Sequence, residues 1–242
     1  MTVLSVNVNK IALLRNSRGR DYPSVVDFAD QVIQLGVRGI TVHPRPDERH
    51  VTRRDVYELS EFLQSKPDIE FNIEGYPTDD FLALVTEVKP DQCTLVPDKP
   101  EQLTSDHGWD ISSNRDQLVQ VLKQLRDLGV RSSLFLDPDP EAVLEVPAVG
   151  ADRIELYTEE YASTFGSPDQ ERVFAQYVAA AAKAHELGIG LNAGHDLDLE
   201  NLTKFLQIPH ILEVSIGHAL VVESLQQGVS SVVSQYLSIC AA

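Results

Sequence analysis

The sequence predicts an α/β fold, a single (β/α)8 TIM barrel domain that spans residues 1–242. Short apolar strand-like runs alternate eight times with longer amphipathic helix-like runs. The length of 242 residues is typical of such a barrel. No Gly-x-Gly-x-x-Gly sequence follows the first strand, which disfavours a dinucleotide-binding open sheet.

The expected elements follow in chain order. Strands are expected at about 3–9, 37–43, 68–73, 91–96, 131–136, 152–157, 189–193 and 211–216. Helices are expected at about 24–36, 52–64, 78–88, 113–128, 139–147, 169–187, 198–206 and 219–238. Glycine ends four of these helices, at Gly36, Gly129, Gly150 and Gly188. Two connections on the strand-to-helix side are long, 10–23 and 97–112, and the second is a candidate lid.

Charge and composition exclude several classes of function. The net charge of −17 argues against binding to nucleic acid or to an anionic membrane surface. Residues 10–54 nevertheless hold nine basic and only five acidic residues, a pattern that suits small anionic ligands. No apolar run is long enough to span a membrane, and residues 1–7 show neither the basic region nor the cleavage site expected of a signal peptide. The two cysteines show no metal-ligand spacing, so we expect a cytoplasmic protein without a metal site.

Two of the expected strands end in the same dipeptide. One apolar run ends at Gly194-His195 and the next at Gly217-His218. Glycine permits a close approach of a ligand to the backbone, and a helix that follows directs free N–H groups at it. Because histidine titrates near neutral pH, the two corners predict a phosphate-ester site beside a proton-transfer group.

Other polar residues also follow the carboxyl ends of the strands, where barrel active sites form. They are Asn7, Asn9, Lys10, His43, Arg45, His50, Glu70, Thr104 and Glu155. A single buried Glu or His is more often structural, but several such residues at the carboxyl ends of the strands favour an active site. We expect burial to raise the pKa of Glu70 and Glu155 toward a useful acid/base range. Arg18 and Arg45 offer planar donors that suit phosphate oxygens.

Motifs along the whole chain resemble the pyridoxine 5′-phosphate synthase family. They are Val6-Asn7-Val8-Asn9-Lys10-Ile11-Ala12-Leu13-Leu14-Arg15-Asn16-Ser17-Arg18-Gly19, Gly39-Ile40-Thr41-Val42-His43-Pro44-Arg45, Arg49-His50-Val51-Thr52, Leu95-Val96-Pro97-Asp98-Lys99, Asn192-Ala193-Gly194-His195 and Ile216-Gly217-His218-Ala219. The resemblance implies condensation of 1-deoxy-D-xylulose 5-phosphate with 3-amino-2-oxopropyl phosphate, which yields pyridoxine 5′-phosphate, phosphate and water. It implies no cofactor and a homo-oligomer, an octamer.

The resemblance also implies roles for residues. His43 and Glu70 are then proton acceptors, His195 is a proton donor, and Glu155 stabilises charge in the transition state. The implied contacts of the aminoketone phosphate are Asn7, Arg18, Asp196, Gly217 and His218. The implied contacts of the deoxyxylulose phosphate are Asn9, Lys10, Arg45, His50 and Thr104.

This chain departs from the family pattern at three places. Asn9-Lys10 stands where many members have Asp-His, Asp196 stands where glycine is common, and residues 74–77 resemble an extension after the third strand. Two other functions stay open: a barrel isomerase or aldolase that acts on one sugar phosphate, and a non-catalytic sensor of a phosphate ligand. A requirement for both substrates would distinguish the synthase from either.

Overall fold

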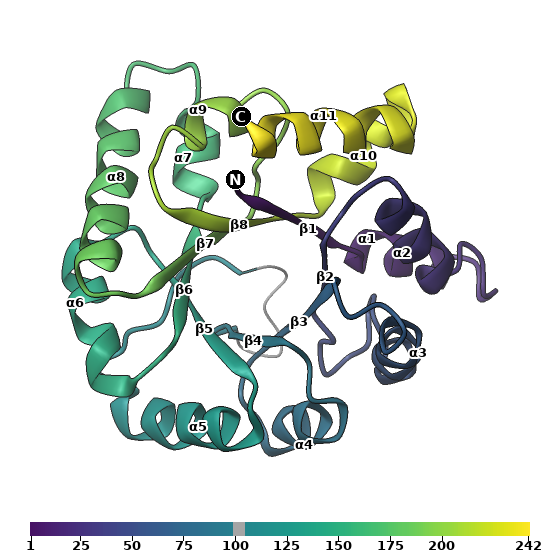
Figure 1. The fold of residues 1–242 in the computed structure, drawn as a ribbon, viewed down its shortest axis with the longest axis horizontal. Helices are drawn as coiled ribbons and strands as arrows, with labels where there is room; N and C mark the ends of the chain where they lie inside the picture. Colours follow the sequence, from purple (N-terminus) through teal and green to yellow (C-terminus); the bar gives the residue numbers. More distant parts are fainter. Residues whose placement is uncertain (99–104) are drawn as a thin grey trace.

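Eight parallel strands close into a barrel in the computed structural model, which describes residues 1–98 and 105–242. Each strand pairs with the next, and β8 closes the ring against β1 (Figure 1). The strands are β1 (Val3–Asn7), β2 (Gly39–Val42), β3 (Glu70–Gly75), β4 (Gln92–Leu95), β5 (Arg131–Leu136), β6 (Arg153–Tyr157), β7 (Gly190–Gly194) and β8 (Ile211–Ile216). The predicted (β/α)8 barrel is thereby confirmed.

Helices surround the strands (Figure 1). Within the described residues they are α1 (Asn9–Asn16), α2 (Val25–Gln34), α3 (Arg53–Leu63), α4 (Asp79–Val88), α5 (Arg115–Leu128), α6 (Pro140–Val149), α7 (Glu159–Thr164), α8 (Gln170–Glu186), α9 (Leu202–Phe205), α10 (His218–Gln227) and α11 (Val229–Ala241). The prediction of a long loop at 10–23 was wrong, because α1 fills its first part. The single helix expected at 219–238 is two helices, separated at Gly228, whose φ is +81°.

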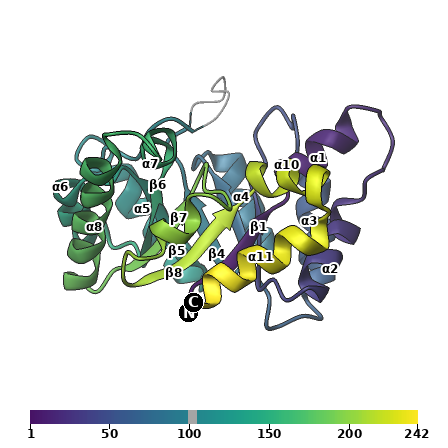
Figure 2. The same cartoon turned by 90° about the horizontal axis from the view of Figure 1, so that it is seen from above.

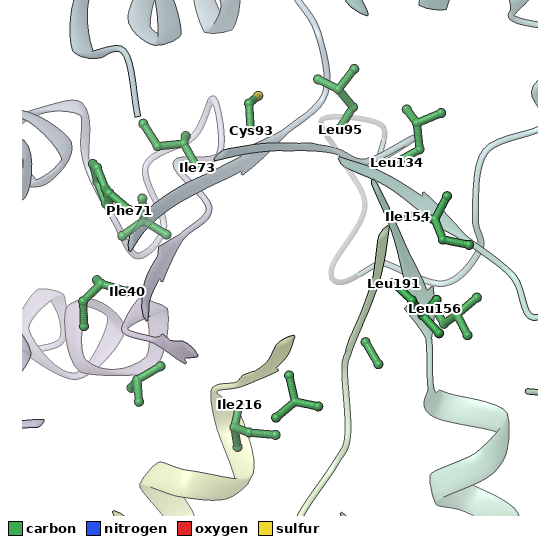
Figure 3. Packing of buried hydrophobic residues seen from close by; sticks show 14 of the residues in the cluster. Ile40, Phe71, Ile73, Cys93, Leu95, Leu134, Ile154, Leu156, Leu191 and Ile216 are labelled. Carbon is green, nitrogen blue, oxygen red and sulfur yellow. The ribbon is translucent and has the colours of Figure 1, made fainter. Parts of the chain in front are cut away.

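Apolar side chains of the strands point outward, toward the helices. Figure 3 shows Ile73, Cys93, Leu95 and Leu134 on the outer side of the ring of strands. These side chains are fully buried, and they form one cluster with the inner faces of the helices. Removal of this apolar surface from water is the main force that holds the helices on the barrel.

Polar side chains occupy the inward positions, because successive residues of a strand face opposite sides of the sheet. The Ser5 and Thr41 hydroxyls lie 2.8 Å apart, and Thr94 Oγ1 donates to Asn72 Oδ1 at 3.1 Å. Asn192 Nδ2 donates to Gln92 Oε1 across the barrel interior at 3.3 Å. TIM barrels usually fill this space with branched apolar residues, so this interior is unusually polar.

Charged side chains close the end of the barrel at which the strands begin. Glu70 pairs with Arg131, and Arg153 Nη1 lies 3.7 Å from Glu213 Oε2. The four residues come from β3, β5, β6 and β8, so the ion pairs link strands that are not neighbours. This cluster lies opposite the strand ends, where barrel active sites form.

Helix α1 is tied to the start of α3 by a buried ion pair. Arg15 binds both carboxylate oxygens of Asp55, with Nη2 2.8 Å from Oδ2, and both side chains are less than a tenth exposed. Asp55 also accepts from the backbone N–H of Thr52, which completes a capping box. Asn16 Nδ2 donates to the carbonyl oxygen of His50 at 2.8 Å. The loop between β2 and α3 is therefore held from both sides.

The chain ends meet at the end of the barrel where β1 begins (Figure 2). The Thr2 N–H donates to the Cys240 carbonyl at 3.1 Å, which fixes α11 beside β1. Within the residues that the structure describes, no helix combines the length and the apolar character needed to cross a membrane.

We predict that Arg15→Met lowers the free energy of unfolding by about 3–5 kcal/mol, because it leaves the buried Asp55 carboxylate without its partner. Urea denaturation measures the change. The matched control is Arg54→Met, which removes the exposed pair between Arg54 and Asp21 and should change stability little. Equal losses of unfolding free energy in the two variants would show that burial does not make the Arg15–Asp55 pair more important for stability than an exposed pair.

Candidate functional site

A cavity of about 560 Å³ opens at the carboxyl ends of the strands. Small-molecule sites commonly have volumes of roughly 300–1,000 Å³. The predicted site residues that line it are Asn7, Asn9, Lys10, His43, Arg45, His50, Glu155, His195, Asp196, Gly217 and His218. The structure therefore brings together most of the residues that the sequence nominated, from five different strand ends.

His43 and Glu74 form the buried centre of this cavity. His43 Nδ1 lies 3.9 Å from Glu74 Oε2, and Asn7 Nδ2 donates to the same oxygen at 3.4 Å. The backbone N–H of His43 donates to Asn9 Oδ1 at 2.9 Å, and the N–H of Asn9 donates to Asn7 Oδ1 at 3.0 Å. The two asparagines thus link the ends of β1 and β2 and hold the histidine against the carboxyl group.

Glu70 does not belong to this cavity. It is the first residue of β3, in the ion cluster at the opposite end of the barrel, whereas Glu74 is the fifth. Four residues of strand correspond to about 13 Å. The expected strand at 68–73 is 70–75 in the structure, so the carboxyl group at the cavity is Glu74. Both residues face inward, because they differ by an even number of positions.

Burial gives the groups around His43 unusual ionisation. Burial and the charges of Arg45, His50 and Arg49 lower the pKa of His43 well below its usual value. Burial, with the nearby carboxyl groups Asp98 and Glu213, raises the pKa of Glu74 to about 8. At neutral pH the site therefore holds a neutral imidazole, able to accept a proton, beside a protonated carboxyl group.

The pKa values of Glu155 and Glu70 are shifted in opposite directions. Burial and the neighbouring Glu74 raise the pKa of Glu155 well above its usual value, as expected for an enclosed carboxyl group. Burial would also raise the pKa of Glu70, but bonds with Glu213 and Arg131 outweigh it and lower the pKa. The expectation of a raised pKa was therefore wrong for Glu70, because the bonds with Glu213 and Arg131 favour its ionised form.

Basic groups line the side of the cavity next to the β2–α3 loop. Burial and the charges of Arg45 and Lys10 lower the pKa of His50 to about 4. His50 Nδ1 accepts the N–H of Val51 at 2.9 Å, so the hydrogen of its neutral ring is on Nε2. Arg45 pairs with the buried Asp98, which also accepts from Ser105 Oγ at 2.8 Å. Lys10, Arg45 and the His50 ring are donors that suit an anion.

The β8 corner has the form that the sequence predicts. Helix α10 begins at His218 directly after the strand, and its N-cap Gly217 provides no side-chain cap. Gly217, His218 and Ala219 line the cavity, so the unsatisfied N–H groups at the start of this helix are available to an anion.

The β7 corner differs from the prediction. No helix starts at His195; the next one, α9, begins at Leu202. The His195 corner therefore offers a side chain and a turn rather than the start of a helix. The space beside the glycine at each corner is occupied by a side chain of the protein, so a Cβ there would meet that side chain. A Cβ at Gly194 would lie 2.3 Å from Glu155 Oε1, and one at Gly217 would lie 3.1 Å from the Asn7 Cβ.

Three further sequence predictions remain without a place in the cavity. Arg18 is exposed in the turn that follows α1 and does not line the cavity. Thr104 lies outside the described residues, as does part of the candidate lid at 97–112. Residues 1–98 and 105–242 contain no group of three or more His, Cys, Asp or Glu side chains placed to hold a metal ion.

Glu74 and Ser105 also line the cavity, although neither was predicted as a site residue from the sequence. Glu74 had a signal, because it continues the inward alternation of Glu70 and Asn72 by one more step. Nothing in the sequence singled out Ser105, whose contact with Asp98 exists only after the chain has folded.

Comparisons with known proteins cover nearly the whole chain. The family described as "Pyridoxal phosphate biosynthesis protein PdxJ" matches residues 4–242. The chain is 52% identical to a pyridoxine 5′-phosphate synthase of Bacteroides thetaiotaomicron over 98% of each chain. It is 48% identical to one of Porphyromonas gingivalis, again over 98% of each chain.

Solved structures show similarity in fold alone. The chain matches the structure of a 3-hexulose-6-phosphate synthase with a TM-score of 0.66 and 11% identity, over 98% of this chain and 99% of that one. It matches a phosphoribosyl anthranilate isomerase from Thermotoga maritima with a TM-score of 0.65 and 10% identity, over 100% and 99% of the two chains.

We predict that Glu74→Gln raises the free energy of unfolding, increasingly so as the pH rises from about 5 to about 8. The folded carboxyl group keeps its proton up to a pKa of about 8, but the unfolded one loses it near 4.5. Rising pH therefore favours the unfolded state across this window, and glutamine removes that effect. Urea denaturation at several pH values measures it.

Glu70→Gln is the matched control for this experiment. The lowered pKa of Glu70 means that the folded state favours its ionised form, so its stabilisation is present above the unfolded pKa. This variant should lose stability at neutral pH. A gain of stability in both variants would contradict the opposite environments assigned to the two carboxyl groups.

Proposed function

The chain belongs to the family described as pyridoxal phosphate biosynthesis protein PdxJ, and we propose that it is a pyridoxine 5′-phosphate synthase. The proposed reaction joins 1-deoxy-D-xylulose 5-phosphate to 3-amino-2-oxopropyl phosphate and releases phosphate and water. The observation that carries the proposal is one cavity in which buried acid/base groups lie between two sets of anion-binding donors. Both substrates carry a phosphate, and the condensation of an amine with a ketone needs protons in both directions.

The two proposed phosphate sites lie on different walls of the cavity. The start of α10, with Gly217 and His218, faces the aminoketone phosphate, and Asn7 packs against Gly217. Asn9, Lys10, Arg45 and His50 face the deoxyxylulose phosphate. Support comes from the donors that each wall presents: helix N–H groups on one side, and cationic and ring N–H groups on the other.

The acid/base roles follow from the ionisation of each group. We assign His43 as a proton acceptor, because its lowered pKa keeps the ring neutral. Glu74 takes the acceptor role that the resemblance suggested for Glu70, once it has lost its own proton near pH 8. His195 is the proposed proton donor. Glu155 is the proposed charge-stabilising group, since a cationic imine beside it would favour its ionised form.

Arg18 and Thr104 are retained as proposed phosphate contacts on the resemblance alone. Arg18 follows the helix whose first residues line the cavity, but it is exposed in the turn beyond it. The alternative of a sugar-phosphate isomerase or aldolase gains no support from the two solved structures, because they are only 10–11% identical to this chain and share the barrel alone.

We further propose a cytoplasmic homo-oligomer, an octamer by resemblance. Exposed apolar side chains support contacts between copies: Leu14 in α1 is 52% exposed, and Tyr22 and Leu225 are each 79% exposed. Sedimentation of the purified chain at several concentrations should show one species of eight times the chain mass. A single species at 26.8 kDa would contradict this proposal.

We predict that purified protein forms pyridoxine 5′-phosphate and free phosphate in equal amounts, and only when both substrates are present. The chromophore of the product and the released phosphate are measured in one reaction. Phosphate release or sugar rearrangement with one substrate alone would favour an isomerase or aldolase. Saturable binding without turnover would favour a phosphate sensor.

Activities of two carboxyl variants test the assignment of the acceptor. Glu74→Gln should lower kcat by about 10²- to 10⁴-fold, the contribution typical of a positioned acid or base. Glu70→Gln, at the other end of the barrel, should retain most of the activity per folded molecule. The opposite ranking, with folding verified by circular dichroism, would return the role to Glu70.

A further inference from the structure

The turn after β7 holds two consecutive non-glycine residues in the left-handed region. The φ angles are +86° at His195 and +58° at Asp196. Such conformations cost about 1–3 kcal/mol each and persist only where the surroundings impose them. Here Thr158 Oγ1 donates to the carbonyl oxygens of Gly194, at 2.8 Å, and of His195. The buried Asn201 donates from Nδ2 to the Asp196 carbonyl at 3.1 Å.

This backbone brings the side chains of the two residues together. His195 Nδ1 lies 2.7 Å from Asp196 Oδ2, and the His195 ring meets the Tyr157 ring edge-on at 5.1 Å between centroids. Both His195 and Asp196 line the cavity. The pair therefore lies on the wall of the cavity and stays partly open to solvent, with the Asp196 side chain 41% exposed.

The ionisation of Asp196 identifies which ring nitrogen carries the hydrogen. The hydrogen bond from His195, together with the charges of His195, His218 and Lys10, lowers the pKa of Asp196. An ionised carboxylate only accepts hydrogen bonds, so His195 Nδ1 must be the donor. A neutral ring then has its lone pair on Nε2, and a protonated ring is stabilised by the adjacent negative charge.

We propose that Asp196 is a positioning residue for His195, which fixes the orientation and the tautomer of its ring. This inference rests on the proposed function, in which His195 gives a proton to the substrate. The pairing is the one that carboxylates make with catalytic histidines in general: the carboxylate holds Nδ1–H and the other nitrogen transfers the proton.

The alternative role of Asp196 is a contact with the aminoketone phosphate. Its carboxylate would repel a phosphate, and it is already engaged with the imidazole. Among the described residues, charged and titratable groups that face the pair include Lys10 from α1, His218 from α10 and Tyr157 from β6. The Lys10 cation helps to keep the carboxylate ionised, so the two departures from the family pattern, Lys10 and Asp196, support each other electrostatically.

The first test reads the His195 ring directly and needs no turnover. In protein labelled with ¹⁵N-histidine, the His195 nitrogen shifts should report hydrogen on Nδ1 in the native chain when the ring is neutral. Asp196→Asn and Asp196→Gly should shift the ring toward a mixture of both tautomers. Asparagine and glycine both tolerate a left-handed backbone, so these variants should fold. Identical tautomer populations in all three proteins would overturn the proposal.

The second test separates positioning from substrate binding. Asp196→Asn should lower kcat by about 10- to 100-fold, part of what a positioned acid contributes, with little change in KM for the aminoketone phosphate. Glu159→Gln removes an exposed carboxylate near Tyr157 that does not contact His195, and its kcat and KM should match those of the native chain.

A double-mutant cycle decides between the two roles. If Asp196 acts through His195, then Asp196→Asn should have no further effect on kcat in a His195→Gln background. Independent, multiplying losses with a raised KM would instead assign Asp196 to the phosphate. If the native chain made no pyridoxine 5′-phosphate, the proposed function would fail, but the tautomer measurement would still decide the relation between Asp196 and His195.

Discussion

The alternation of side chains along the strands is the constraint on which this structure depends. Outward positions hold the apolar residues that pack against the helices, so the fold does not need apolar residues inside the barrel. The inward positions are then free to hold amides, hydroxyls and charges. Ser5 and Thr41 bond at one level, and Gln92 and Asn192 bond at another. Ionisable groups can occupy both ends of such a barrel, and the neighbouring charges and hydrogen bonds differ between the two ends.

The two glutamates of β3 show how strongly the surroundings decide chemistry. Both are inward carboxyl groups on the same strand, and burial opposes the ionisation of each. Bonds with Glu213 and Arg131 offset the effect of burial at Glu70, so its carboxylate stays ionised as part of an ion cluster. At Glu74 the nearby carboxyl groups of Asp98 and Glu213 strengthen the effect of burial instead. Direct bonds thus give an ionised structural group at one end of β3, and nearby like charges give a protonated carboxyl group at the other.

The sequence predicted the barrel and most of the cavity, because both depend on local patterns. The eight strands and the Gly217-His218 corner followed from apolar runs and their polar ends. Three features were not predictable in this way. The two-turn helix α1 has Val8 as its N-cap and lacks a side-chain cap, so it carries no start signal. Glu70 and Glu74 both occupy inward positions of β3, so the alternation of side chains does not tell them apart. Only the position of the carboxyl end of β3 shows that Glu74 lies at the cavity. The ion pair of Arg15 with Asp55 joins residues 40 positions apart.

The Asn9-Lys10 pair differs from the Asp-His of many family members in charge, but Asn9 can hold His43 in the same position. The Asn9 side chain accepts the His43 N–H through Oδ1, a bond that a carboxylate would make equally well. Asparagine therefore preserves the position of His43 while it removes a negative charge from its surroundings. A carboxylate at that position would favour the protonated ring, against the burial and cations that lower the pKa of His43. Asn9 thus helps to keep His43 neutral, while Lys10 places a basic side chain on the wall of the same cavity.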